Sequence, residues 1–317
     1  MQSRNCKLRG VITPLVTPLR NRRTLDENSL ERLIEHVIGG GVQGLFVLGS
    51  TGEGPSLSVD LRCSLIQRAS EITAKRVPLI VNVSDTALEH TVRLANVSAN
   101  AGAFALALSP PCYFGLDQDQ LGAYIINFCE KSPLPVFLYN IPQFAHTALK
   151  AETVCHLAEL PKVIGLKNSN GSLDYLESVQ SGLVRRDDFT LLVGNEETFL
   201  AALKLGADGG VCGGANMFPE IFVRLFEAAA NGNDAEAERT QQIIVAVSNA
   251  VYTVGPSETS YLRGLKHALA MLELIDDVIA EPLQNFDAAE CAELESRFSD
   301  LLRAMDYVPE MKKVKTV

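Results

Sequence analysis

The sequence predicts a closed (β/α)8 barrel followed by a C-terminal helical extension. Three observations support this fold class: short apolar runs alternate with helical patterns, eight such pairs fit between residues 10 and 230, and no GxGxxG motif follows an early strand. Strict alternation implies parallel strands joined by right-handed crossovers. Eight units fit a closed barrel better than an open sheet, and the missing glycine motif argues against a dinucleotide-binding fold.

The eight predicted strands are short apolar runs. They cover residues 10–18, 44–48, 77–83, 104–108, 135–139, 163–167, 189–193 and 208–212. A proline ends the first of them. Continuous apolar character is typical of parallel strands that are buried on both faces.

A helical pattern follows each strand. These patterns cover residues 26–38, 58–74, 86–101, 117–131, 148–160, a stretch from 173, 196–205 and 219–230. In the first, Leu30, Leu33, Ile34 and Val37 recur at the spacing of one apolar helix face. Acidic residues open this helix and glycines close it, as capping and the helix dipole favour.

After residue 219 the sequence shows only helical patterns, and those beyond the barrel cover residues 235–254, 258–274 and 287–305. We therefore predict a catalytic barrel in residues 1–231 and a helical extension in residues 232–317. No low-complexity linker separates the two parts, so we expect the extension to pack on the barrel.

The composition excludes several classes of protein. The hydrophobic share of 47% is ample for a core, and the net charge of −10 argues against a nucleic-acid partner. No apolar run approaches the ~20 residues of a membrane span, and residues 1–9 lack the apolar core of a secretory signal. Seven cysteines without a CxxC pair predict reduced thiols in a cytoplasmic protein. The five histidines show no metal-ligand spacing, so we predict no metal.

The sixth predicted strand ends at a lysine. The apolar run Val163-Ile164-Gly165-Leu166 stops at Lys167. An unpaired buried ammonium carries a large desolvation cost, so a strand interior does not accept one. Lys167 therefore lies either at the solvent end of its strand or in a site that uses it.

Other polar residues follow the remaining strands. In a (β/α)8 barrel, residues just past the carboxyl ends of the strands converge on one open face. The polar residues and glycines predicted there are Thr13, Thr17, Ser50, Thr51, Glu53, Ser109, Tyr113, Tyr139, Asn140, Lys167, Gly194, Asn195, Glu196, Glu197, Gly213, Gly214 and Asn216.

A lysine that faces hydroxyls and a phenol is suited to imine chemistry. The amine must be neutral to attack a ketone, and burial at an apolar strand end favours the neutral form. A tyrosine nearby can then move protons. The glycine- and hydroxyl-rich loop 49–54 enters a helix and presents N–H groups to a small carboxylate. A ketone beside a carboxylate, as in pyruvate or another 2-oxo acid, matches both the lysine with its tyrosine and this loop.

Each feature also has an ordinary structural explanation. A glycine-rich loop is commonly just a turn, and Tyr139 could be a rim tyrosine with its hydroxyl in water. The glycines near Gly213 could serve tight packing or bind a phosphate. The convergence of residues from four strands favours a site over these explanations.

Three motifs carry a resemblance to a known family: Gly49-Ser50-Thr51-Gly52-Glu53, Tyr139-Asn140-Ile141-Pro142 and Ile164-Gly165-Leu166-Lys167. In order and spacing they resemble the signatures of the dihydrodipicolinate synthase / N-acetylneuraminate lyase family, from about Val11 to the C-terminal helices. The resemblance implies a (β/α)8 barrel and a metal-free class I lyase. It also implies that this lyase acts on pyruvate through a Schiff base, with no cofactor beyond that covalent bond on Lys167.

The resemblance also implies roles for individual residues. Lys167 matches the imine-forming lysine and Tyr139 the tyrosine that relays protons. Ser50 and Thr51, in the loop that begins at Gly49, match the pair that holds the pyruvyl carboxylate and joins the relay.

Two further matches concern the subunit contact and the reacting centre. Tyr113 matches the tyrosine that reaches into the neighbouring subunit's site, which implies a homotetramer or a homodimer. Val211 falls where a backbone carbonyl contacts the reacting centre.

The sequence departs from the synthases of this family in the region that receives the second substrate. Phe144 stands where synthases carry an arginine for the carboxylate of aspartate semialdehyde, and Ser50-Thr51 reads as in the lyases. The loop Gly194-Asn195-Glu196-Glu197 resembles the lyase loop that grips sugar hydroxyls. Ser169 is a further candidate contact.

These departures favour a 2-oxo-3-deoxy sugar acid or a sialic-acid-like substrate, which yields or consumes pyruvate and an aldehyde. The alternatives are a synthase that condenses pyruvate with aspartate semialdehyde and a dehydratase of a deoxy-oxo sugar acid. A barrel that binds a 2-oxo acid without turnover, as a regulator or scaffold, is a rival from another class. The intact Lys167 and Tyr139 pair argues against that rival.

Overall fold

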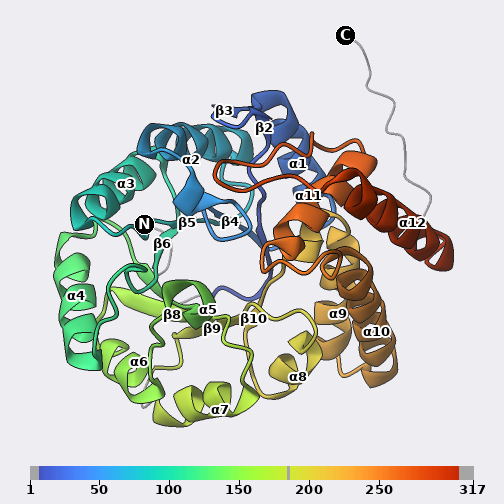
Figure 1. Cartoon of the computed structure of the whole chain (residues 1–317). Helices are drawn as coiled ribbons and strands as arrows, with labels where there is room; N and C mark the ends of the chain where they lie inside the picture. Colours follow the sequence, from blue (N-terminus) through green and yellow to red (C-terminus); the bar gives the residue numbers. More distant parts are fainter. Residues whose placement is uncertain (1–6, 184–185, 307–317) are drawn as a thin grey trace.

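Eight parallel strands close into a barrel in the computed structural model, which describes residues 7–183 and 186–306 (Figure 1). The ring runs in the order β1-β10-β9-β8-β7-β6-β5-β4, with β1 paired to β10 on one side and to β4 on the other. The strands are β1 Gly10–Pro14, β4 Gly44–Val47, β5 Leu79–Asn82, β6 Ala105–Leu108, β7 Val136–Asn140, β8 Val163–Asn168, β9 Thr190–Val193 and β10 Gly209–Val211. The predicted (β/α)8 barrel is confirmed.

Helices surround the barrel, so the strands are buried on both faces (Figure 1). They are α1 Glu27–Gly39, α2 Val59–Thr73, α3 Leu88–Ala101, α4 Gln118–Lys131, α6 Ala151–Leu157, α7 Leu173–Gly182, α8 Phe199–Lys204 and α9 Pro219–Ala230. Their starts follow from capping: Asp26 accepts from the N–H of Ser29, and Asp117 forms a capping box with Gln120. None of the described helices is both long and apolar enough to cross a bilayer.

The structure differs from the sequence prediction in several short elements. The first strand ends at Pro14 rather than at residue 18, because the chain then turns into a small antiparallel hairpin of β2 Leu19–Asn21 and β3 Thr24–Leu25. A short helix, α5 Pro142–Ala145, and two 3-10 helices, η1 Gly54–Ser56 and η2 Gly213–Asn216, were not predicted. Single turns of this length leave no periodic apolar pattern in a sequence.

The inside of the barrel is filled by its own side chains. Along β7, Phe137 and Tyr139 belong to this inner cluster, whereas Val136 and Leu138 pack outward against the helices. Gly165 on β8 makes room for Phe137, because a Cβ there would lie 2.4 Å from the phenylalanine ring. The glycine of the third motif is therefore needed for packing beneath the site.

Three further helices, α10 Asp234–Val251, α11 Ser260–Met271 and α12 Ala288–Ala304, lie along one side of the barrel (Figure 1). Helix α10 packs on α8 and α9, and α11 on η2. A buried ion pair joins this extension to the loop after β4: Lys266 is paired with Glu53, and both side chains are 0% exposed. Lys266 also donates to the carbonyl of Val278 at 2.6 Å, and Glu53 accepts from the N–H of Ala280 at 2.7 Å.

We expect Lys266→Met to lower the free energy of unfolding by about 3–5 kcal/mol, because it leaves the Glu53 carboxylate buried without its counter-charge. Urea denaturation measures this loss. Arg23→Met is the matched control, since Arg23 pairs with Glu281 at 81% exposure and is screened by water. A Lys266→Met variant as stable as this control would contradict the structural role of the ion pair.

Candidate active site at the barrel mouth

Lys167 and Tyr139 are neighbours across β8 and β7. They are register partners in the sheet, and their side chains are 5% and 3% exposed. The Lys167 Nζ lies 4.1 Å from the centre of the Tyr139 ring and 4.2 Å from the centre of the Phe46 ring. Among the described residues it has no carboxylate partner and no hydrogen bond, so the two ring faces are its contacts. The amine is therefore available to a ligand.

The two rings fix each other. Phe46 on β4 meets Tyr139 edge to face, with centroids 5.8 Å apart and planes at 79°. The Tyr139 hydroxyl forms no hydrogen bond with the residues that the structure describes, although its ring is buried. It is thus oriented but not committed to a protein partner.

The loop after β4 is held in a strained shape that the glycines permit. Glu53 has a φ of 55°, and a Cβ at Gly54 would lie 2.0 Å from the carbonyl oxygen of Leu48. Thr17 donates to the carbonyl of Gly52 at 2.6 Å, so this threonine clamps the loop rather than facing a ligand. At Gly49 an added Cβ would lie 2.6 Å from the Phe46 ring.

A cavity of about 380 Å³ opens at this end of the barrel, within the range of small-molecule sites. Ser50, Tyr139, Ser109 and Phe144 all line it, so the loop after β4 and the end of β7 share one space. Arg62 lines it too and donates to the Asp85 carboxylate at 2.9 Å.

Thr51 lies deeper than Ser50. It is 6% exposed, and its hydroxyl lies 2.7 Å from the hydroxyl of Tyr261 on α11. The pattern of polar residues after the strands does not reveal Tyr261, because it comes from the extension. No motif in the sequence marks it.

Glu196 and Glu197 are engaged with other parts of the chain. Glu196 is 4% exposed and accepts from the Gly214 N–H at 2.8 Å and from the Tyr252 hydroxyl at 3.2 Å. Glu197 accepts from the Ser248 hydroxyl on α10 at 2.5 Å. A sugar hydroxyl would have to displace these partners, so contact with a second substrate stays a prediction for both carboxylates.

The pKa of the Glu196 carboxyl lies above its ordinary value. Burial, aided by the charge of Glu197, raises the pKa of this carboxyl to about 7, although the donors Gly214 and Tyr252 oppose the rise. Cys212, at the end of β10, is buried beside it, and burial likewise raises the pKa of the thiol.

The remaining predicted residues are either buried at the strand ends or exposed on the surface. Val211 is 3% exposed on β10, and Gly194 lies against Ser169, whose Oγ would be 2.2 Å from an added Cβ. Tyr113 is 79% exposed, far more than the rest of the candidate site, and meets Phe114 edge to face with centroids 4.9 Å apart. It contributes nothing to the mouth of its own chain as described.

Two predicted asparagines serve the backbone. Asn216 donates to the carbonyls of Pro14 and Gly213, and Asn140 accepts from the N–H of Leu149. Both hold the ends of strands in place.

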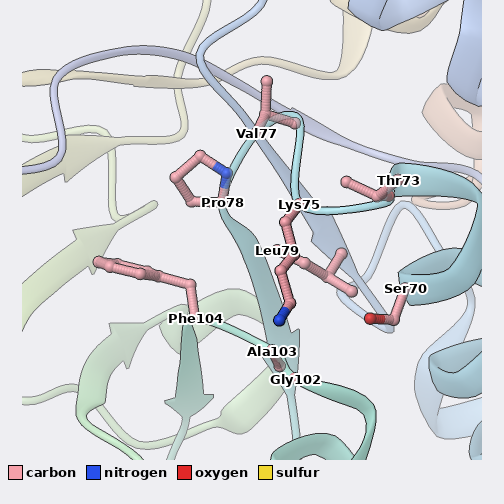
Figure 2. Close-up of a pocket in the computed structure, with 9 residues that line it drawn as sticks. All are labelled: Ser70, Thr73, Lys75, Val77, Pro78, Leu79, Gly102, Ala103 and Phe104. Carbon is pink, nitrogen blue, oxygen red and sulfur yellow. The ribbon is translucent and has the colours of Figure 1, made fainter. Parts of the chain in front are cut away.

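A second cavity, of about 470 Å³, lies at the opposite end of the barrel, near the start of β5 and β6 (Figure 2). Lys75 extends into it toward Gly102 and Ala103. The hydroxyls of Ser70 and Thr73 already donate to the backbone at 2.6 Å. This cavity is larger than the one at the mouth but offers one cation and few free hydrogen-bonding groups.

The fold and the mouth define a (β/α)8-barrel enzyme with a buried lysine at the carboxyl end of the sixth barrel strand. Residues 7–301 match the model of the dihydrodipicolinate synthetase family, and the chain therefore belongs to that family and is a lyase. Among the described residues, no cluster of three or more histidine, cysteine, aspartate or glutamate side chains could hold a metal ion.

Individual relatives agree over nearly the whole chain. A 4-hydroxy-tetrahydrodipicolinate synthase of Herminiimonas arsenicoxydans is 30% identical over 297 residues, which cover 94% of this chain and 97% of that protein. The structure of a dihydrodipicolinate synthase from Bacteroides thetaiotaomicron has a TM-score of 0.90 and 42% identity, covering 93% of this chain and 99% of that one. YagE, a prophage protein of E. coli K12 in complex with pyruvate, has a TM-score of 0.88 and 26% identity, covering 93% and 99%.

The raised pKa of Glu196 predicts a pH dependence of stability. The folded state binds the Glu196 proton more tightly than the unfolded chain does. The contribution of this proton to the free energy of unfolding is therefore full below about pH 4.5 and is lost as pH rises through about 7. A shift from 4.5 to about 7 corresponds to about 3 kcal/mol. We expect Glu196→Gln to lose less stability than the wild type between pH 4.5 and 8 in urea denaturation.

Glu227→Gln is the control, because Glu227 is an exposed carboxylate on α9 and takes no part in the group around Glu196. Equal slopes of stability against pH in the wild type and in Glu196→Gln would show that Glu196 titrates normally.

Proposed function

We propose that this chain is a pyruvate-dependent class I aldolase or lyase that forms a Schiff base between Lys167 and a 2-oxo acid. The observation that carries the proposal is the Lys167 amine, which is buried against two rings, without a carboxylate partner, beside the uncommitted hydroxyl of Tyr139. A lysine kept only for structure would be paired or would reach solvent. The pyruvate complex of YagE supports pyruvate as the ligand.

The reaction follows from these positions. The neutral amine of Lys167 adds to the ketone carbon, and loss of water leaves the imine. Loss of a proton from the neighbouring carbon gives an enamine, which attacks the aldehyde carbon; water then hydrolyses the product imine and restores the amine. Cleavage runs the same steps in reverse.

Protons in these steps pass through groups at the mouth. Tyr139 and Ser50 line the same cavity and serve as proton donors and acceptors for the ketone and aldehyde oxygens. Thr51 and the N–H groups of the loop that begins at Gly49 hold the carboxylate. The backbone carbonyl of Val211 faces the reacting centre.

For the second substrate we propose a 2-oxo-3-deoxy sugar acid or a sialic-acid-like compound. Phe144 lines the cavity with an apolar ring that is 45% exposed, where a guanidinium would clamp a second carboxylate. The Ser50 hydroxyl lines the same space without a hydrogen-bond partner among the described residues, so it suits a hydroxylated chain. Asn82, Ser84 and Ser109 line it too, but their polar groups are already bonded to one another and to the backbone. Gly194 and Ser169 pack against each other just after β9 and β8, and they are the proposed contacts to its far end.

A synthase acting on aspartate semialdehyde is the second candidate, and a dehydratase of a deoxy-oxo sugar acid is the third. The synthase is favoured by the names of the relatives, including the one from B. thetaiotaomicron at 42% identity.

We further propose a homodimer or homotetramer in which Tyr113 enters a neighbouring subunit. Tyr113 and Phe114 are 79% and 74% exposed and meet edge to face, and two adjacent aromatic rings in water are costly unless a partner covers them. Sedimentation velocity would show a mass above 34.3 kDa. The six described cysteines are free thiols, which supports a reducing compartment such as the cytoplasm.

We expect the wild-type protein, treated with pyruvate and borohydride, to gain one reduced adduct on Lys167, because borohydride reduces the imine and locks it. Peptide mass spectrometry locates the adduct. Lys167→Ala should take none, whereas Lys75→Met should still label, since Lys75 lies in the cavity at the opposite end of the barrel. An unmodified wild-type mass would contradict the proposal.

We expect a panel of aldehydes with pyruvate to show faster turnover with sugar aldehydes than with aspartate semialdehyde. Phe144→Arg supplies a guanidinium at the cavity and should raise kcat/KM for aspartate semialdehyde by about 10-fold or more. Coupled assays of pyruvate consumption measure both. If aspartate semialdehyde is the best acceptor of the wild type, the synthase is correct and the interpretation of Phe144 is wrong.

A further inference from the structure

Two tyrosines of the C-terminal helices contact the loops at the barrel mouth. Tyr252, at the end of α10, and Tyr261, on α11, meet edge to face with centroids 4.7 Å apart and planes at 75°. The Tyr261 hydroxyl lies 2.7 Å from Thr51 Oγ1, and the Tyr252 hydroxyl donates to Glu196 at 3.2 Å. The pair therefore links the loop after β4 to the loop after β9.

The glycines after β10 leave space for the side chains that form this link. A Cβ at Gly213 would lie 2.1 Å from the Tyr261 hydroxyl, and a Cβ at Gly214 would lie 2.9 Å from the Glu196 carboxylate. The N–H of Gly214 donates to that carboxylate, so it is not free for a phosphate. Of the two explanations given for these glycines, tight packing is the one that the structure supports, because they make room for Tyr261 and Glu196.

The hydroxyl of Tyr261 keeps its proton, so it can donate to Thr51, although the geometry lets either oxygen of this pair be the donor. Burial, together with the charges of Glu196 and Tyr139, raises its pKa, whereas the hydrogen bond to Thr51 opposes the rise. The group therefore keeps its proton throughout the physiological range. A hydroxyl has one proton to give and two lone pairs to accept with. When the Tyr261 hydroxyl donates its hydrogen bond to Thr51, the hydroxyl proton of Thr51 remains free to bond to another acceptor.

We propose that Tyr261 is a positioning residue: its hydroxyl donates to Thr51 Oγ1 and so turns the Thr51 proton toward the carboxylate of the bound 2-oxo acid. This rests on the proposed function, in which Thr51 holds that carboxylate. Tyr252 and Glu196 hold the Tyr261 ring in place, and Gly213 leaves the space that its hydroxyl needs. The extension thereby becomes part of the substrate site.

The test compares Tyr261→Phe with a matched control. Tyr261→Phe keeps the ring stack and removes only the hydroxyl. One hydrogen bond is worth about 0.5–1.5 kcal/mol, so we expect the Kd for pyruvate and the half-saturation of borohydride trapping to rise about 3- to 10-fold. The kcat at saturating pyruvate should change less. Tyr175→Phe removes another tyrosine hydrogen bond, to the Leu149 carbonyl at 2.8 Å outside the mouth, and should leave the Kd unchanged.

A double variant separates positioning from packing. If Tyr261 acts through Thr51, then Tyr261→Phe added to Thr51→Val should weaken pyruvate binding no further than Thr51→Val alone. Gly213→Ala should raise the Kd for pyruvate as Tyr261→Phe does, because it displaces the hydroxyl. In the Tyr261→Phe background the same change should raise the Kd less. Additive effects, or an unchanged Kd for Tyr261→Phe, would overturn the proposal.

Calorimetry with pyruvate keeps the two proposals apart. If the wild type binds pyruvate but takes no adduct on Lys167, the Schiff-base function fails, and the Kd of Tyr261→Phe still decides the role of Tyr261. If the wild type takes the adduct and Tyr261→Phe binds as tightly, only the positioning role fails. A wild type that does not bind pyruvate overturns both.

Discussion

The burial of one amine at the end of β8 is the constraint on which the mouth of this barrel depends. An amine in an apolar wall needs contacts that hold it, and here they come from the faces of Phe46 and Tyr139 rather than from a carboxylate. A carboxylate would hold the lysine charged and occupied. Ring faces keep it in place and leave the nitrogen accessible, which is what an imine-forming lysine requires. Gly165 lies two residues before Lys167 on the same strand, and it allows Phe137 to pack closely in the layer beneath the amine.

The C-terminal helices have a larger part in the site than their position outside the barrel suggests. The ion pair of Lys266 with Glu53 ties them to the loop after β4, and Tyr261 reaches the neighbouring Thr51 in the same loop. Both contacts fall on a loop whose residues are proposed to hold the 2-oxo acid. The geometry of the carboxylate pocket is thus set partly from outside the eight repeating units.

Much of the fold could be predicted because burial leaves a regular trace in the sequence. The apolar runs fell within a few residues of the observed strands, and the order of the units gave the closed ring. The hairpin of β2 and β3 and the short helix α5 were missed, because two or three residues carry no period. Lys167, Tyr139 and Ser50 were placed together by strand order alone, and the structure does bring Tyr139 beside Lys167 and into one cavity with Ser50.

The sequence by itself determined the barrel, the strand that carries Lys167 and the neighbours that strand order gives it, because these follow from hydrophobic periodicity and chain direction. Only the tertiary structure decided that Glu196 faces Gly214 and Tyr252 rather than open space, and that Tyr261 reaches Thr51 across 210 residues. Contacts of that kind depend on how the extension packs against the ring. Packing is set by the shapes of many side chains at once, so no local pattern in the sequence records it.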